Sequence, residues 1–195
     1  MTSKLASKII MIRNTQTNFG LLTRLIHWLS ALTIFGLFGV GYWMVDLSYY
    51  SEWYQTAPHW HESVGILLLV VTVFRLVWKT IQITPKPLST HSASDQKKAK
   101  AVHYLLYLLM FTLFITGYLI PTADDRSIEV FSWFALPSIG ALFDKQEDIA
   151  GTIHEYGAYT LIAIAVLHAL AALKHHFIDK DETLKRMVSR TNNKD

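Results

Sequence analysis

Histidine is the residue type with which this chain of 195 residues could do metal or redox chemistry, because it has nine histidines and no cysteine. The absence of cysteine excludes disulfides, iron–sulfur clusters, thiolate zinc sites, covalently attached c-type haem and cysteine nucleophiles. Two of the histidines, His154 and His168, are fourteen residues apart. In an α-helix this spacing falls about 40° short of four full turns and corresponds to about 21 Å along the axis. One helix would therefore present two imidazoles on one face at two depths.

Partners for these two imidazoles lie at matching depths in other apolar segments. His61 stands at the start of its segment, as His154 does, while His27 and His103 stand near the ends that correspond to His168. His27 lies deeper than His103 and matches the depth of His168 better. The role of His103 stays open: it could be a metal ligand, a partner of a haem propionate or a packing residue. Two facing imidazoles suit the axial positions of a haem iron, whereas zinc would need about four ligands at each site. We predict two non-covalent b haems, held by His61 with His154 and by His27 with His168.

Small and cationic residues near these positions suit a flat, anionic cofactor. Gly41 and Gly117 come round to the faces of the inner histidines at the outer level, and Gly65 lies one turn beyond an outer histidine. Glycine is also common where membrane helices pack together, so these positions are weak indications.

A group of cations lies at the inner level, where haem propionates would need them. Arg75 points into the core at the inner depth, and His175 lies about two turns beyond His168 on nearly the same face. Arg24 and Lys174 lie close by. Cations there would offset the burial of the propionates, and a histidine with a lysine could supply protons to a quinone. The alternative for Arg24 and Lys174 is a location among the lipid headgroups. His91, in a polar linker, is expected to be merely solvated.

The elements that must position these residues are four apolar segments, each long enough to cross a membrane. They run over residues 21–45, 61–78, 102–120 and 153–177. The chain is 51% hydrophobic and 17% charged, with a mean hydropathy of +0.26, which argues against a disordered chain, a nucleic-acid-binding arm or an ordinary soluble domain. Because backbone in lipid must satisfy its own hydrogen bonds, we predict an all-α fold: one domain, 1–195, forming an integral membrane four-helix bundle.

Two of the connections carry predictions of their own. The linker over residues 84–100 is rich in proline and serine and is predicted to be a polar loop. The outer loop over 121–152 contains an apolar stretch, 130–137, that either lies at the membrane interface as an aromatic belt or covers something beneath it.

The charges of the loops predict the orientation in the membrane. Sixteen of the 18 lysines and arginines lie in the N-terminal arm, between the second and third segments, or near the C-terminus. Ten of the 15 acids lie in the other two loops, together with only Arg126 and Lys145. The formal charges of the two faces are then +11 and −8. By the positive-inside rule, both termini are expected in the cytoplasm of a bacterium, with the chain in its inner membrane.

These residues together resemble a known family. The motifs are Arg24-Leu25-Ile26-His27-Trp28, His61 to Gly65 with Arg75, His103 with Tyr107, and His154 and His168 followed by Lys174-His175-His176-Phe177. They resemble the bacterial cytochrome b561 family, four-helix inner-membrane cytochromes with two non-covalent b haems. Further motifs such as Trp43-Met44-Val45 and Gly117-Tyr118-Leu119-Ile120 are similar to a subgroup found beside a small periplasmic isoprenoid-binding protein. The resemblance implies axial ligands at His27, His61, His154 and His168, and ubiquinone as redox partner.

The reading that follows is transmembrane electron transfer between a periplasmic donor or acceptor and membrane quinone. Whether the chain is an enzyme stays open: it could be a superoxide:ubiquinone oxidoreductase, although an outer face of formal charge −8 disfavours an anionic substrate. It could also be the membrane anchor subunit of a dehydrogenase, or a haem-free proton or metal transporter. Membrane lipid, quinone, a periplasmic electron donor and a second copy of the chain are the expected partners; nucleic acid is not.

Overall fold

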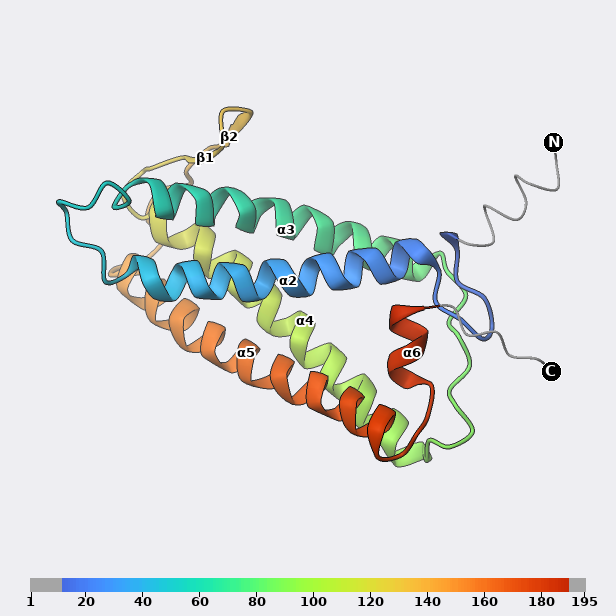
Figure 1. Ribbon diagram of the computed structural model, residues 1–195. Helices are drawn as coiled ribbons and strands as arrows, with labels where there is room; N and C mark the ends of the chain where they lie inside the picture. The colour runs from blue at the N-terminus through green and yellow to red at the C-terminus, as the bar shows by residue number, and fades with distance from the viewer. Residues whose placement is uncertain (1–11, 190–195) are drawn as a thin grey trace, which may run out of the picture. The chain divides into compact units, whose positions relative to one another are not determined.

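The computed structural model describes residues 12–189. Within this part of the chain the long helices are α2 (Leu21–Met44), α3 (Thr56–Thr80), α4 (Ala93–Thr122) and α5 (Gln146–Phe177), and the short helix α6 (Thr183–Val188) follows them (Figure 1). Each long helix has the length and composition to cross a membrane. Their outward side chains are apolar, with Leu32 exposed by 71% and Leu167 by 64%, as expected for residues that face lipid.

Three of the four long helices, α3, α4 and α5, are longer than the apolar segments that predicted them, whereas α2 ends one residue before the predicted bound. Helix α3 begins at Thr56 and α5 at Gln146, several residues before the predicted starts at 61 and 153. An apolar criterion detects only the part of a helix that lies in lipid, whereas backbone hydrogen bonding continues into the polar ends.

The largest difference is at α4, where the predicted loop over 84–100 is wrong in its second half, because the helix begins at Ala93. The Ser92 hydroxyl accepts the N–H of Asp95 at 3.1 Å, and the Asp95 carboxylate accepts the N–H of Ser92 at 3.3 Å. This reciprocal arrangement satisfies two N–H groups that a helix start leaves without intrahelical partners. A serine followed three residues later by an aspartate is a sequence pattern typical of a helix start. The proline and serine content of the linker, taken alone, does not reveal this pattern.

The connection between α4 and α5 contains a small antiparallel hairpin, so the fold is mostly helical rather than all-α. Strand β1 (Ile128–Val130) pairs with β2 (Phe134–Leu136) in the register Ile128↔Leu136. Ile128 and Val130 are buried. The Ser63 hydroxyl of α3 donates to the carbonyl of Glu129 at 3.1 Å and accepts the N–H of Phe131 at 2.9 Å. The beginning of the apolar stretch predicted at 130–137 thus contacts the start of α3, while Trp133 and Phe134 remain exposed.

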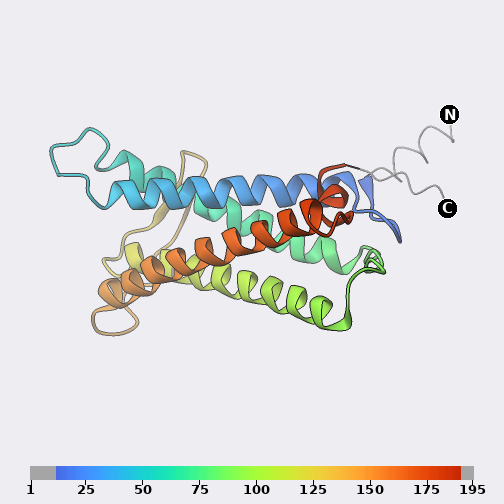
Figure 2. The same cartoon turned by 60° about the horizontal axis from the view of Figure 1, so that its bottom comes forward.

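The described chain divides into two compact units. The first comprises residues 12–31, 71–103 and 165–189, and the second comprises Leu32–Val70 and Tyr104–Ile164. In the first unit α6 packs beside the start of α2, as the red and blue helices of Figures 1 and 2 show. The Trp28 indole donates to the carbonyl of Met187 at 2.8 Å, and the Arg24 guanidinium donates to that of Val188 at 3.0 Å. These bonds satisfy carbonyls that the end of a helix leaves without intrahelical partners.

In the second unit a buried glutamine joins the start of α5 to the end of α4. The Gln146 amide donates to the carbonyl of Leu119 at 2.9 Å and accepts the N–H of Leu142 at 2.7 Å. The carbonyl of Thr122, the last residue of α4, accepts a hydrogen bond from the Ser138 hydroxyl at 3.1 Å. The side chains of Gln146 and Ser138 therefore satisfy carbonyls at the end of α4 and join it to the start of α5.

Candidate functional site

The second unit brings the two predicted outer histidines together. The ring centres of His61 on α3 and His154 on α5 are 6.1 Å apart, with 67° between the ring planes. With metal–nitrogen bonds of about 2.0 Å, and a ring centre about 1.1 Å behind each nitrogen, two imidazoles on opposite sides of one metal have centres about 6.2 Å apart. The observed separation therefore accommodates one metal atom between the rings.

The hydrogen bonds of Thr116 assign the proton on His154. The Thr116 hydroxyl donates its one hydrogen to the carbonyl of Thr112 at 2.8 Å, and its oxygen lies 3.1 Å from Nδ1 of His154. Since the hydroxyl hydrogen is already used, Nδ1 of His154 must be the donor in this second bond. The neutral ring then carries its lone pair on Nε2, which is the form that binds a metal through Nε2. Nδ1 of His61 is buried, and the backbone of Leu37 is a hydrogen-bond partner of this histidine.

Two of the three predicted glycines allow helix backbones to approach these rings. A Cβ added at Gly41 would lie 3.1 Å from Cε1 of His61, and one added at Gly117 would lie 3.0 Å from Cε1 of His154. Carbon atoms not bonded to one another pack best at about 3.5–4.0 Å, so a methyl group at either position would press on an imidazole. A Cβ at Gly65 would have no protein atom within 4 Å among the described residues, so this glycine borders open space.

The first unit brings the predicted inner histidines together as well. The ring centres of His27 on α2 and His168 on α5 are 6.4 Å apart, with 81° between the planes. His103 on α4 is also close to His168, at 5.3 Å between ring centres. That distance is about 1 Å shorter than two trans imidazoles require, whereas the distance to His27 fits. The geometry thus favours His27 over His103 as the partner of His168, as the depth argument does.

Arg75 lies beside the inner pair, and its contact sets the protonation of His27. Nη2 of Arg75 is 3.1 Å from Nδ1 of His27. A guanidinium has only donors, so Nδ1 of His27 must accept, and the proton of the neutral ring then lies on Nε2. For Nε2 to bind iron this proton has to leave, and Arg75 loses its acceptor if the proton moves to Nδ1. The positive charge of Arg75 beside this pair suits an acidic group of a cofactor, and such a contact stays a prediction.

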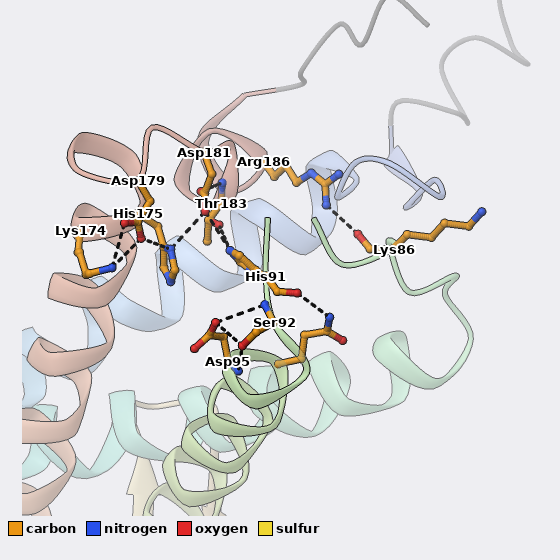
Figure 3. Close-up of polar contacts among 11 residues, drawn as sticks. Lys86, His91, Ser92, Asp95, Lys174, His175, Asp179, Asp181, Thr183 and Arg186 are labelled. Atoms are coloured by element: carbon orange, nitrogen blue, oxygen red, sulfur yellow. Dashed lines mark hydrogen bonds and ion pairs between the residues drawn. The ribbon is translucent and has the colours of Figure 1, made fainter. Parts of the chain in front are cut away.

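The other predicted inner cations contact protein groups. Nζ of Lys174 forms an ion pair with the carboxylate of Asp179 at 2.7 Å, and the Arg24 guanidinium bonds the end of α6. Nδ1 of His175 lies 2.9 Å from Asp179 and 3.2 Å from Asp181 (Figure 3). Whether Arg24, Lys174 or His175 contacts a cofactor stays a prediction.

His91 is the histidine that the sequence interpretation missed, since the expectation that it is merely solvated is wrong. Its Nε2 bonds the buried carboxylate of Asp181 at 2.9 Å, and its ring centre is 4.7 Å from that of His175 (Figure 3). The two partners lie about 90 residues away, so no local pattern indicates them. The sequence offers one local indication: the helix start at Ser92, directly after His91, shows that the backbone at this position is ordered.

On the second unit, Arg126 forms an ion pair with an acid that adjoins one of the paired histidines. Its guanidinium bonds both carboxylate oxygens of Glu62, at 2.9 and 3.2 Å, and Glu62 directly follows His61. One of the two cations expected on the outer face is therefore neutralised beside the outer histidine pair.

Comparison with known proteins agrees with this arrangement. The chain matches the prokaryotic cytochrome b561 family over residues 18–190. It is 46% identical to Cytochrome b561 homolog 2 of Escherichia coli (strain K12), over 91% of this chain and 95% of that protein. It is 31% identical to the Probable superoxide oxidase CybB of Yersinia pestis, over 84% and 91% of the two chains. Cytochrome b561 homolog 1 of E. coli is 27% identical over 85% and 93%. The resemblance inferred from the histidine motifs is thus confirmed for the family: the chain belongs to the prokaryotic cytochrome b561 family, membrane proteins that transfer electrons by means of haem b.

Proposed function

We propose that this chain passes electrons across the bacterial inner membrane between a periplasmic partner and a quinone, using two b haems. His61 with His154 would hold one haem, and His27 with His168 the other. The observation that carries this proposal is that both pairs of ring centres, at 6.1 and 6.4 Å, match the spacing of two imidazoles bound to one metal.

The donor set also restricts the chemistry. A haem b with two histidine ligands supplies a one-electron centre without a vacant iron position, which favours electron transfer over dioxygen binding. The surrounding residues orient and retain the ligands: Thr116 holds His154 in the tautomer that binds through Nε2, and Gly41 and Gly117 admit the two outer rings. At the inner pair, Arg75 offers a positive charge to a haem propionate.

For the inner side we propose a ubiquinone site near Arg75 and His175. The distribution of lysine and arginine supports an orientation with both termini in the cytoplasm, so this would be the cytoplasmic side. His175 stands about two turns after His168 on α5, and imidazole is a side chain that proteins use to transfer protons. A quinone gains protons when it gains electrons, so a titratable group beside it is needed.

For the outer side we propose a neutral or cationic periplasmic partner. The outer loops carry a formal charge of −8, and Glu62 neutralises Arg126 beside His61. Such a surface attracts cations and repels anions. The sequence motifs make a periplasmic isoprenoid-binding protein a candidate, and a second copy of the chain could lie alongside in the lipid.

The experiment that tests the haem assignment counts haem per chain in purified wild type, His61→Ala and His168→Ala, with His59→Ala as a matched control outside the pairs. We expect two haems in the wild type and the control, and one in each of the other variants. Retention of both haems by His61→Ala and His168→Ala would refute the ligand assignment.

A second candidate function is superoxide oxidation, because one relative bears the name Probable superoxide oxidase CybB. The variant Glu62→Gln distinguishes the two, since it releases the charge of Arg126 near the outer pair. Reduction of the protein by superoxide should become faster in Glu62→Gln and more sensitive to salt if superoxide is the substrate. No reduction by superoxide in either protein would exclude this candidate.

A further inference from the structure

The first unit contains a cluster of ligating side chains outside the two histidine pairs. His91 precedes α4, His175 lies in the last turns of α5, and Asp181 lies between α5 and α6 (Figure 3). One ligating atom from each residue lies within 4.8 Å of the other two. An oxygen of Asp181 stands between the rings, 2.9 Å from Nε2 of His91 and 3.2 Å from Nδ1 of His175.

One ring nitrogen of His175 is buried without a hydrogen-bond partner among the described residues. Its Nδ1 is buried and has carboxylate oxygens of Asp179 and Asp181 nearby, yet it forms no hydrogen bond with any described residue. Both oxygens lie within hydrogen-bonding distance of this nitrogen, so it is the angle at the nitrogen that is unsuitable for a hydrogen bond. The nitrogen thus has two carboxylates close by without a hydrogen bond to either, which is a favourable position for a cation.

Asp181 is charged and fixed in place. Its side chain is only 3% exposed, and its other oxygen accepts the N–H of Thr183 at 2.8 Å. Although burial opposes it, the hydrogen bonds from Thr183 and His91 and the nearby His175 lower the pKa of Asp181. A buried carboxylate that stays ionised and faces two imidazoles is a preformed part of a metal site.

We propose that His91, His175 and Asp181 bind a divalent transition-metal ion of the zinc class. Two imidazoles and one carboxylate are the donor types that such ions prefer, and magnesium and calcium prefer oxygen ligands alone. Donor atoms around a tetrahedral zinc lie about 3.3 Å apart. The Asp181 oxygen, now 2.9 and 3.2 Å from the two ring nitrogens, would move away by less than about 0.5 Å. The ligating atoms of the three residues lie within 4.8 Å of one another, so the two imidazoles would need to approach by at most about 1.5 Å. Asp179 is held by Lys174, which leaves the fourth position to water.

The proposed ion would connect three parts of the chain that are far apart in sequence. It would join the linker before α4 to the end of α5 and to the segment that leads into α6. Arg186 of α6 already bonds the carbonyl of Lys86 in this linker, at 2.9 Å. Metal binding should therefore slow local opening of the linker, an effect that can be measured apart from electron transfer.

The test is a calorimetric titration of the purified haem-loaded protein with Zn²⁺, after any affinity tag has been removed. The variants are His91→Ala and Asp181→Asn, and His59→Ala is the control because it removes a histidine outside the cluster. Asp181→Asn keeps the shape of the side chain and removes its charge. The wild type and the control should each bind one Zn²⁺ ion per chain. The two cluster variants should bind Zn²⁺ at least about tenfold more weakly. Added Mg²⁺ should not displace Zn²⁺ from the wild type.

Two results would overturn the proposal: absence of zinc binding by the wild type, or the same affinity in all four proteins. Hydrogen exchange supplies an independent measurement, in which Zn²⁺ should slow exchange of the amides over residues 86–95 in the wild type but not in Asp181→Asn. If the cluster is only a hydrogen-bonded brace, Zn²⁺ will leave exchange in this stretch unchanged, and the proposal is wrong.

A consequence rests on the proposed quinone site. A coordinated His175 cannot carry a proton, so Zn²⁺ should slow reduction by ubiquinol in the wild type and have less effect in His91→Ala. Calorimetry separates the two proposals, because zinc binding without inhibition would reject the role of His175 at the quinone and leave the metal site intact.

Discussion

A single methyl group at residue 41 tests whether close approach of α2 positions the ring of His61. A Cβ at this position would lie 3.1 Å from Cε1 and 3.6 Å from Nδ1 of that ring. Carbon atoms pack best at about 3.5–4.0 Å, so in Gly41→Ala the ring or the helix has to move by about 0.4 Å or more. An imidazole displaced in this way no longer points its ligating nitrogen at the same place.

The expected cost can be stated as a loss of haem affinity. Overpacking by one methyl group in a well-packed site costs about 1–3 kcal/mol. If the strain is relieved when the haem leaves, the affinity of the outer site falls roughly 5- to 150-fold. Among the described residues, a Cβ at residue 41 has only atoms of His61 within 4 Å, so the inner site should keep its haem.

The assay is haem content per chain after dialysis, with redox titration to resolve the two centres. Gly39→Ala is the matched control, because it lies on the same helix and a Cβ there has no atom within 4 Å in the described structure. Alanine is a better helix former than glycine, so the control should be as stable as the wild type or slightly more so. Equal haem content and equal potentials in Gly41→Ala and Gly39→Ala would refute the positioning argument.

Three further substitutions examine the surroundings of the histidines. Thr116→Val removes the acceptor of the His154 N–H and should weaken haem binding at the outer site about 10- to 100-fold, whereas Thr116→Ser should restore it; a haem titration measures both. Arg75→Gln removes a cation beside the inner pair, so the midpoint potential of the inner haem should fall, on the order of tens of millivolts, in a redox titration. His103→Phe should keep two haems per chain and His27→Phe only one, as counted by absorbance; the reverse result would assign His103 as the ligand.

The sequence predicted the helices and the proximity of the histidines because both follow from regular geometry. An α-helix that spans lipid has a fixed rise, so position in the chain translates into depth. His61 and His154 were matched in this way, and their rings lie close together in the structure, as do those of His27 and His168. Their ligation of iron stays a prediction.

The side-chain hydrogen bonds around the rings could not be predicted in the same way. Thr116 and His154 belong to different helices, 38 residues apart. Helices that are apolar on all sides have no polar stripe from which their rotation can be inferred. Unless the rotation of each helix about its axis is known, the sequence does not show that Gly41 approaches His61 rather than another side chain. It indicates only the depth of Gly41 along its helix.

The connections were the least predictable part, yet two of them carried local signals. Around β1, Ile128 and Val130 are buried while Glu129 between them is exposed, which is the alternation of a half-buried strand. Three residues are too short a run for this pattern to decide the structure. His91 shows the complementary difficulty: its role depends on Asp181 and His175, which only the fold brings near it.

The charge of the outer loops illustrates why a formal sum is a poor guide to what a redox partner meets. The side chain of Arg126 is 55% exposed, but both oxygens of Glu62 bind its guanidinium. At distances larger than the separation of its two charges such a pair acts as a weak dipole and attracts neither ion type strongly. The remaining acids then dominate the field at longer range. An incoming cation would be attracted by the loops as a whole and would meet no net charge from this pair beside His61, which suits a protein partner that docks before it exchanges an electron.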